Sequence, residues 1–288
     1  MTNKALEITN LSSNIGSFSL RDINLSIEKG TIMGLIGKNG AGKTTLIKTI
    51  LEKYERKNGQ VFFDGISMYG NEEIVKAKIG VVYDTLIYSL AYKPNKIVSM
   101  LSPFYKDFDF KKYDYLMGRF DLDSNKKLMD YSKGMQMKFG LVLALCHNPD
   151  LLILDEPTAG LDPVARAELM DILLEYMQNE EKSILFSTHI TSDLEKIADY
   201  ITFMDNGKIL MCAEKDSLID SHVIVHIDKE TMTDKIKSQL MGLKETSFGY
   251  EGLSYTKYNL ETLPGIKTTR PTIEDIMLYM GGKRSWIK

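Results

Sequence analysis

A glycine-rich run of eight residues carries the clearest chemical information in the chain. It fits the pattern G-x-x-x-x-G-K-[ST] and comprises Gly37, Lys38, Asn39, Gly40, Ala41, Gly42, Lys43 and Thr44. The glycines allow successive backbone N–H groups to turn inward around phosphate oxygens, and a following helix directs its positive end to the same point. We expect Lys43 to reach the β- and γ-phosphates of a nucleotide and the Thr44 hydroxyl to ligate Mg²⁺, with Thr45 beside them.

Two carboxylates follow an apolar stretch much further along the chain. Residues 151–154 are apolar, and Asp155 and Glu156 come directly after them. A buried strand would deliver Asp155 to Mg²⁺ at its carboxyl end, where α/β proteins bind ligands. Glu156 would then lie where it can orient or activate an attacking water. The alternative is a strand end with two solvated acids, but the phosphate-binding loop favours a site for nucleotide phosphates and Mg²⁺.

Hydrophobic periodicity places both segments in an α/β fold. Apolar and polar residues alternate in the first thirty positions, which is typical of antiparallel strands. An apolar strand, Ile32–Ile36, precedes the phosphate-binding loop, and residues 44–51 are predicted to form the helix after it. Strands and helices alternate from residue 151 onward, as in a parallel sheet built of βαβ units. The predicted elements are strands 61–63, 79–83, 151–154, 183–187 and 200–204, and helices 163–178 and 192–198.

Two further regions differ from this core. Residues from about 85 to 148 show helical spacing and crowded aromatic side chains, and they are predicted to form a helical subdomain. Residues 221–288 are predicted to form a small α+β extension, with a strand at 222–227, a helix at 232–243, a hairpin at 247–258 and a helix at 272–280. Thr272 and Asp275 resemble a capping box at the start of the last helix, and Gly281 resembles its C-terminal cap. The main domain would then span residues 1–220.

Three more motifs follow in a fixed order. Residues 131–136 are YSKGMQ at the start of a helical run, residues 159–162 are AGLD, and Thr188 and His189 follow a strand. Together with the phosphate-binding loop and the Asp155–Glu156 pair, they resemble the motifs of ABC-type ATPases over residues 1 to about 218. The resemblance implies a P-loop NTPase core of ABC type, with an antiparallel β subdomain and a helical insertion.

The same resemblance implies a site shared between two chains. Two cassettes of this family face each other head to tail, and the YSKGMQ segment, the signature, closes over ATP held by the other chain. Ser132 and Gly134 would contact that γ-phosphate, with Lys133 and Met135 beside them. A helix N-terminus there would favour the anion.

The resemblance also assigns two residues near the attacking water. His189 would orient the γ-phosphate and the water next to Glu156. Asp162, in the segment 159–162 called the D-loop, would link the two sites across the dimer.

Three positions depart from the family pattern. The signature of the family is LSGGQ, and Lys133 brings a cation to this segment. Asp84 stands where the family has its Q-loop glutamine, and it would either bind Mg²⁺ through water or relay motion. The aromatic that stacks on adenine is missing at Asn14, and we predict Phe18 as its substitute.

These departures resemble the bacterial ABC-2-type exporters, in the group of bacitracin-resistance and YtrB-like ATPases, to which an exporter of phenol-soluble modulins also belongs. The resemblance implies an ATPase that powers export of a peptide, toxin or antibiotic-like substrate. Its partners would be an integral-membrane transporter subunit, docked near Tyr88 and Tyr92, and a second ATPase subunit, identical or paralogous. We expect it at the cytoplasmic face of the cell membrane as a peripheral protein.

Composition limits the alternatives. The net charge of −3 argues against a nucleic-acid partner, which would require a basic face. A soluble ABC ATPase acting on ribosomes or DNA remains the alternative, but such relatives usually carry two cassettes or long coiled-coil insertions. A membrane-spanning helix takes about 20 apolar residues, and we expect none. Cys146 and Cys212 are predicted to be reduced and buried, because no CxxC pair is present.

Overall fold

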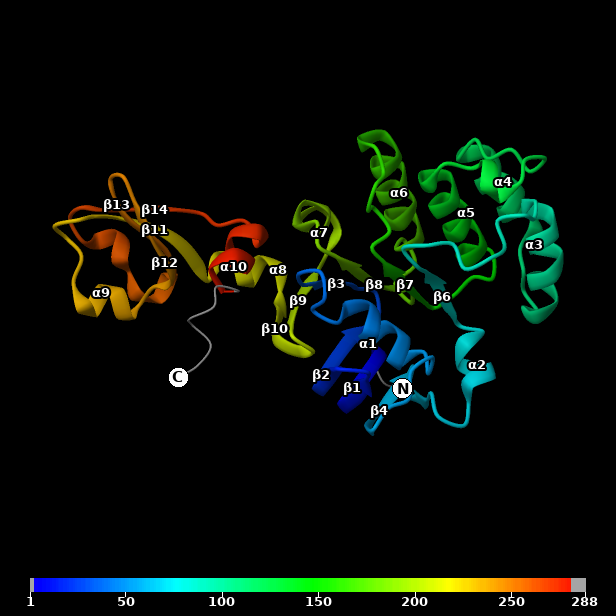
Figure 1. Cartoon of the computed structure of the whole chain (residues 1–288), viewed down its shortest axis with the longest axis horizontal. Coiled ribbons are helices and arrows are strands. Elements are labelled where there is room, and N and C mark those ends of the chain that lie inside the picture. The colour runs from blue at the N-terminus through cyan, green and yellow to red at the C-terminus, as the bar shows by residue number, and fades with distance from the viewer. Residues whose placement is uncertain (1–2, 281–288) are drawn as a thin grey trace.

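The computed structural model describes residues 3–280, and a six-stranded sheet forms its centre (Figure 1). The strand order is β10-β9-β3-β8-β7-β6, and all neighbours are parallel except the antiparallel pair β9 and β10. The parallel α/β core predicted from the sequence is therefore confirmed. Its strands are β3 (Ile32–Ile36), β6 (Ile79–Val82), β7 (Leu151–Asp155), β8 (Ser183–Thr188), β9 (Tyr200–Asp205) and β10 (Lys208–Glu214).

Strands β3, β7 and β8 are buried along their whole length. In β7, Leu151 and Ile153 pack into one hydrophobic cluster, while Leu152 and Leu154 pack into the other. Both faces of the sheet are therefore covered. This explains why the middle of each strand is apolar on both faces and does not alternate with exposed polar residues.

A second, antiparallel sheet covers one face together with helix α1 (Lys43–Ile50). Leu6 and Ile8 of this sheet are buried in the same cluster as Leu46 and Ile50 of α1. Helix α2 (Glu72–Lys76) then leads to β6. The strands, in the order β2-β1-β4-β5, are β1 (Lys4–Ile15), β2 (Phe18–Glu28), β4 (Asn58–Phe63) and β5 (Ile66–Ser67).

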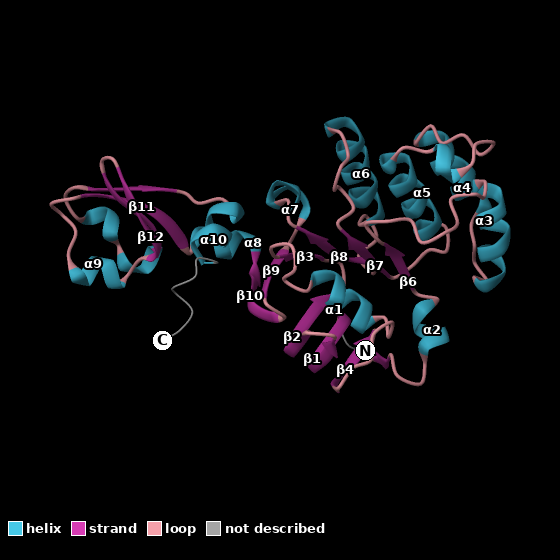
Figure 2. Ribbon diagram, viewed as in Figure 1, coloured by secondary structure: helices cyan, strands magenta, loops and turns pink. Residues whose placement is uncertain are grey.

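Helices cover the other face (Figure 2). The helical subdomain lies beside β6 and contains α3 (Pro94–Leu101), α4 (Phe110–Arg119) and α5 (Lys133–Leu145). Helices α6 (Pro163–Tyr176) and α7 (Thr191–Ile197) follow β7 and β8. Short 3₁₀ turns lie at 102–104, 128–130, 256–258 and 260–262. None of the helices within residues 3–280 has the length and apolar character needed to cross a membrane.

A third sheet makes up the C-terminal extension, at the left of Figure 1. Helix α8 (Lys215–Asp220) leads into it from β10. Its strand order is β12-β13-β11-β14, and helices α9 (Asp234–Ser238) and α10 (Ile273–Met280) pack with it. The strands are β11 (His222–Asp228), β12 (Met241–Thr246), β13 (Gly249–Tyr255) and β14 (Ile266–Thr269).

Two predictions in this extension are wrong. The predicted helix 232–243 ends at Ser238, and β12 starts at Met241. The predicted hairpin at 247–258 is the single strand β13, which pairs with both β12 and β11. Apolar residues recur every four positions at 232, 236 and 240, so the local pattern favours a helix, but non-local pairing overrides it. Gly242 also takes a φ of +61°, which no regular helix allows.

Other local predictions can be compared directly. The capping box is confirmed, because Thr272 N donates to Asp275 Oδ2 at 2.9 Å and Asp275 N donates to Thr272 Oγ1 at 3.1 Å. The predicted cap at Gly281 lies outside the described residues. Cys146 is buried as predicted, but Cys212 is exposed on β10, because this strand forms an edge of the central sheet.

An ion pair between the half-buried Arg166 and the buried Asp193 joins α6 to α7. Arg166 Nη1 lies 3.6 Å from Asp193 Oδ1, and the Asp193 side chain is only 1% exposed. A carboxylate buried this deeply is strongly destabilising without its counter-charge. The pair therefore fixes the relative position of the two helices that follow β7 and β8.

Arg166→Ala should lower the free energy of unfolding by about 3–5 kcal/mol, because Asp193 would stay buried without a counter-charge. Arg119→Ala is the matched control. Arg119 pairs with the exposed Glu175, and such surface pairs are worth about 0–1 kcal/mol. Urea denaturation measures the free energy of unfolding of both variants. An equal decrease in the two variants would show that the contact with Asp193 is not especially stabilising.

Candidate nucleotide-binding site

The site lies where four parallel strands of the central sheet end. Cross-strand pairing sets Ile36 of β3 beside Thr188 of β8, and Ser187 of β8 beside Asp155 of β7. Val82 of β6 pairs with Leu154 in the same register. The segments that follow these strands, the phosphate-binding loop, His189, Glu156 and Asp84, therefore emerge at one edge. The carboxyl edge of a parallel sheet is where α/β proteins bind their ligands.

Backbone geometry shapes the phosphate-binding loop. Gly42, the N-cap of α1, has a φ of +109°, a conformation that side-chain-bearing residues rarely adopt. A Cβ atom on Gly37 would lie 2.4 Å from the Met204 carbonyl oxygen, so the loop fits closely against β9. Lys38, Asn39 and Gly40 form an exposed rim, whereas Ala41 is buried. Thr44 and Thr45 are half-buried at the start of α1.

One carboxylate connects the loop to the end of β8. Glu156 Oε1 lies 3.1 Å from Lys43 Nζ, and Glu156 Oε2 lies 2.7 Å from His189 Nδ1. Lys43 Nζ also donates to the Gly37 carbonyl oxygen at 2.7 Å. The structure thus brings together three residues that the sequence placed in one site from segments more than thirty positions apart.

Glu156 reaches both neighbours because its backbone is left-handed. Its φ is +52°, and its N–H donates to the Ser187 carbonyl oxygen at 2.9 Å. A non-glycine residue in this region costs of the order of 1–3 kcal/mol, and such residues cluster at functional sites. The carboxylate holds an anionic position next to Lys43 and His189. A γ-phosphate bound by Lys43 would compete with it, leaving Glu156 free to accept a proton from a water.

Asp155 is fully buried, one residue earlier on β7. Its Oδ1 accepts a hydrogen bond from Ser187 Oγ at 3.0 Å, while its Oδ2 has no partner among the described residues. Burial raises the pKa of Asp155, and hydrogen bonding with Thr44 and Ser187 opposes that shift. An ionised Asp155 thus needs a further positive partner.

A magnesium ion fits these residues. The free Oδ2 of Asp155 and the hydroxyl of nearby Thr44 are hard oxygen ligands, and Mg²⁺ in nucleotide sites usually takes one or two protein ligands plus phosphates and waters. No group of three or more His, Cys, Asp or Glu side chains suited to a metal occurs within the described chain, so a dedicated all-protein cage is not what the site offers. When bound, Mg²⁺ would neutralise phosphate charge beside Asp155.

Asp84 follows β6 and lies at the same edge, but it is exposed. Its charge contributes to the raised pKa of Asp155, so the two carboxylates are within electrostatic reach. The Thr85 hydroxyl donates to Asp84 Oδ1 at 3.4 Å. This position suits contact with a metal through water better than direct ligation, and the role of Asp84 stays a prediction.

The signature occupies the start of α5. Ser132 is the N-cap, and its Oγ accepts a hydrogen bond from Met135 N at 3.2 Å. Ser132 and Lys133 are exposed, while Gly134 and Met135 are half-buried. Within residues 3–280, no hydrogen bond or ion pair joins the signature to Lys43, Asp155 or Glu156. The structure therefore does not bring these two groups of predicted residues together in one chain.

The signature and the D-loop pack on each other. A Cβ atom on Gly134 would lie 3.2 Å from Leu161 Cδ2, and one on Gly160 would lie 3.7 Å from Lys133 Cδ. Asp162 is the N-cap of α6, where its Oδ1 accepts from two backbone N–H groups, and these bonds lower its pKa. Asp162 thus has a structural role that the sequence did not predict.

Phe18, the predicted adenine-stacking residue, lies against the back of the phosphate-binding loop. A Cβ atom on Gly42 would lie 2.6 Å from its Cζ, and one on Gly207 would lie 3.3 Å away.

Ser187 is a site residue that sequence reasoning missed. Its position directly before Thr188 and His189, one strand away from Asp155, is the signal that could have identified it.

Comparisons with known proteins agree with this geometry. The chain matches the family model of the ABC transporter over residues 20–159. It is 27% identical over 292 residues to the ABC transporter ATP-binding protein YtrB of Bacillus subtilis, covering 98% of this chain and 100% of YtrB. It is 31% identical to the lantibiotic transport ATP-binding protein SrtF of Streptococcus pyogenes (73% and 91% covered) and 34% identical to the bacitracin transport ATP-binding protein BcrA of Enterococcus faecalis (71% and 68% covered).

A solved structure supports the same conclusion. The ATP-binding subunit of an ABC transporter superposes with a TM-score of 0.67 at 27% identity, covering 74% of this chain and 91% of that one. The chain therefore belongs to the ATP-binding proteins of ABC transporters, as predicted. It is an ATPase whose hydrolysis of ATP drives transport.

Glu156→Gln should bind MgATP at least as well as the parent, because it removes the ion pair through which Glu156 competes for Lys43. Hydrolysis should be at least about a hundredfold slower, since a positioned general base contributes about 10²–10⁴-fold. Nucleotide affinity and turnover measure the two effects. Asp155→Asn is the comparison, and it should weaken nucleotide binding itself. Hydrolysis at the parental rate by Glu156→Gln would contradict the assignment of the base.

Proposed function

We propose that this chain powers export of a peptide, toxin or antibiotic-like substrate through a separate integral-membrane subunit, from the cytoplasmic face of the cell membrane. The observation that carries the motor function is the contact chain Lys43–Glu156–His189 at the edge of the sheet. Relatives that transport a lantibiotic and bacitracin support the substrate class. Amphipathic peptides such as phenol-soluble modulins are the first substrates to test, by stimulation of ATP hydrolysis in the reconstituted complex.

Roles for the site residues follow from their positions. Residues 37–45 would hold the phosphates, Thr44 and Asp155 would ligate Mg²⁺, and Asp84 would reach it through water. Glu156 and His189 would act on the attacking water. Phe18 would stack on the adenine ring of the nucleotide. We assign these roles to a domain spanning 1–220 and treat 221–288 as its extension, because α8 joins the two sheets at that point.

A second ATPase chain would complete the site. The exposed Ser132 and Lys133 lie at the start of α5, where the helix dipole favours an anion. Ser132 keeps its hydroxyl hydrogen available, because its oxygen accepts from Met135 N. The γ-phosphate held by another copy, or by a paralogue, is the anion that would face this surface.

Mixing two inactive chains tests the shared site. Lys43→Ala removes phosphate binding and Ser132→Arg blocks the signature, so each homodimer should be inactive. The mixed dimer should regain at most one working site, which predicts up to half of the parental ATPase rate for that species. A mixture of Lys43→Ala with Lys43→Ala/Ser132→Arg is the control and should stay inactive. Full activity of either single-variant homodimer would rule out the shared-site arrangement.

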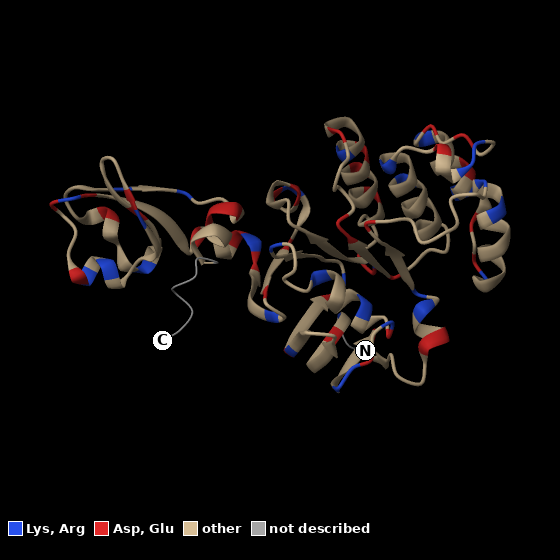
Figure 3. Ribbon diagram, in the orientation of Figure 1, with Lys and Arg blue, Asp and Glu red and all other residues tan. Residues whose placement is uncertain are grey.

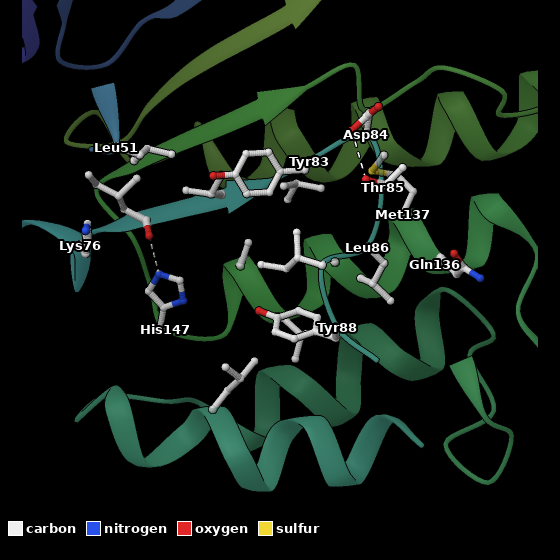
Figure 4. Close-up of a pocket in the computed structure, with 18 of the residues that line it drawn as sticks. Leu51, Lys76, Tyr83, Asp84, Thr85, Leu86, Tyr88, Gln136, Met137 and His147 are labelled. Carbon is white, nitrogen blue, oxygen red and sulfur yellow. Dashed lines mark hydrogen bonds between the residues drawn. The ribbon is translucent and has the colours of Figure 1, made fainter. Parts of the chain in front are cut away.

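A cleft of about 530 Å³ beside the site suits the membrane subunit (Figure 4). It lies between β6 and the helical subdomain, and Asp84 is at its rim. Two buried polar atoms at its wall, Tyr83 Oη and His147 Nδ1, have no partner in the described part of the chain. His147 Nε2 lies 3.1 Å from the Ile79 carbonyl oxygen, so only one ring nitrogen remains to be satisfied.

The helical subdomain that forms one side of this cleft carries exposed apolar side chains, of which Ile87 and Leu90 line the cleft itself. They belong to residues 87–129 of the helical subdomain, and exposed patches of this kind mark protein interaction sites. Tyr88, predicted to face the partner, is half-buried in the cleft wall, and burial raises its pKa to about 12. The exposed residues are Ile87, Leu90, Tyr92, Met100, Phe104, Phe110, Tyr115 and Met129.

Charge supports a protein partner rather than a nucleic acid. Acidic and basic residues are interspersed along the elements of both the core and the extension (Figure 3). A nucleic-acid surface needs basic residues clustered on one face. An integral-membrane protein is therefore the partner expected at the cleft.

Ile87→Glu should uncouple the chain from its membrane partner, because it places a charge at the exposed rim of the cleft. ATPase activity of the isolated chain should stay within about twofold of the parent, while stimulation by the membrane subunit is lost. Ile74→Glu is the matched control, since Ile87 is 61% exposed and Ile74, on α2, is 57% exposed. Co-purification and ATPase assays measure the outcome. Normal stimulation of Ile87→Glu would contradict docking at this cleft.

A further inference from the structure

Helix α7 follows His189 directly in the chain. It begins at Thr191, two residues after His189, and it has only seven residues. The Thr188 hydroxyl accepts a hydrogen bond from Ile190 N at 2.9 Å, so the turn between strand and helix is short and tight. A shift of α7 would therefore move His189 relative to Glu156, which it contacts at 2.7 Å.

Two acidic side chains attach α7 to different neighbours. Asp193 pairs with Arg166 of α6, which begins at the D-loop. Glu195 reaches the opposite way, and its Oε1 accepts a hydrogen bond from Ile273 N at 3.0 Å. Ile273 is the first residue of α10, so a helix of the C-terminal extension is bound to the helix that carries His189.

The contact completes the N-terminus of α10. Thr272 and Asp275 satisfy each other's backbone N–H groups, which leaves the N–H of Ile273 between them. Glu195 supplies the missing acceptor, and its charge suits the positive end of the helix. The first turn of α10 therefore depends on α7 as well as on its own sequence.

Apolar packing makes the connection rigid. Ile273 and Ile276 are both 0% exposed and belong to the same cluster as Leu194 of α7. Further along α10, Met277 and Met280 line a small cavity with Gly37, Lys38 and Met204, directly behind the phosphate-binding loop. One face of α10 thus packs against the helix after His189, and it shares a small cavity with the first residues of the phosphate-binding loop.

The other face of α10 is fixed to the extension. Tyr279 hydrogen-bonds Glu251 of β13, and Lys244 Nζ lies 4.2 Å from the centre of its ring. A Cβ atom on Gly242 would lie 2.7 Å from the Tyr279 carbonyl oxygen, so the helix sits close against β12. Movement of the third sheet would therefore be passed to α10.

We propose that Glu195 is a positioning residue for ATP hydrolysis, through which α10 and the C-terminal extension hold α7, and with it His189, in place. The inference rests on the proposed role of His189 at the γ-phosphate. It assigns residues 221–280 a function in setting the hydrolysis rate, which the nucleotide-binding motifs do not describe.

Three single variants of the full chain test the contact. Glu195→Ala should lower kcat about fivefold with KM for ATP within twofold, because His189 is displaced while the phosphate-binding loop is intact. Glu195→Gln retains an acceptor oxygen and should keep at least half of the parental kcat. Glu274→Ala is the matched control, since Glu274 is an exposed acid in the same first turn of α10 and should leave kcat unchanged.

Hydrogen–deuterium exchange separates positioning from general instability. Glu195→Ala should speed exchange over residues 189–197 and leave residues 151–155 of β7 unchanged. Tyr279→Phe cuts the link between α10 and the sheet, so it should lower kcat in the same direction, and combining it with Glu195→Ala should add little, because both act on one route.

These experiments can fail or succeed independently of the proposal that the chain powers export. The assays use the chain without its membrane partner, so a missing partner would leave them valid. The inference would be overturned if Glu195→Ala kept the parental kcat, or if Glu274→Ala lowered kcat as much as Glu195→Ala does. A change in KM for ATP without a change in kcat would also overturn it. If exchange over 189–197 changes while kcat does not, His189 is not the residue that α10 positions, and the inference also fails.

Discussion

The parallel register of β3, β8 and β7 is the constraint on which the remaining structure depends. It sets the ends of three strands side by side, so that Lys43, His189 and Glu156 meet although they are far apart in the chain. Both faces of these strands must then be covered, which requires the antiparallel sheet on one side and helices on the other. The left-handed backbone of Glu156 has a cost that this firm support can offset.

Sequence periodicity predicted the core well because its strands are short, are mostly apolar and are separated by turns or helical segments. Strand Ile32–Ile36 was predicted at its observed bounds. Motif spacing predicted which residues meet at the sheet edge, but not the left-handed turn at Glu156, the Ser187–Asp155 hydrogen bond or the capping of α6 by Asp162, because these depend on backbone conformation. In the extension, β12 was missed because its pairing with β13 overrides the local sequence pattern, which favours a helix. The catalytic and binding roles stay predictions.

The ATPase core is surrounded by three surfaces with different chemistry. The cleft beside β6 is largely apolar with a few unsatisfied polar atoms, the start of α5 offers a hydroxyl and a cation, and α10 contributes a packed, apolar contact. In the proposed arrangement, each surface would reach a different part of a nucleotide site: the cleft through Asp84, the start of α5 through the γ-phosphate of the second chain, and α10 through α7. Such an arrangement allows separate inputs to act on one hydrolysis step without sharing residues.

A hydroxyl that both caps a helix and meets a phosphate, as proposed for Ser132, restricts which side chains the N-cap position of α5 can tolerate. Its oxygen accepts from Met135 N at 3.2 Å, and its hydrogen is still available to a phosphate. Aspartate caps a helix equally well, but it has no hydrogen to donate and would repel a phosphate. Asparagine caps and donates through different atoms, and so needs more space. Only a hydroxyl performs both functions from one small group, which makes serine or threonine the natural choice wherever a helix must begin at a second molecule's phosphate.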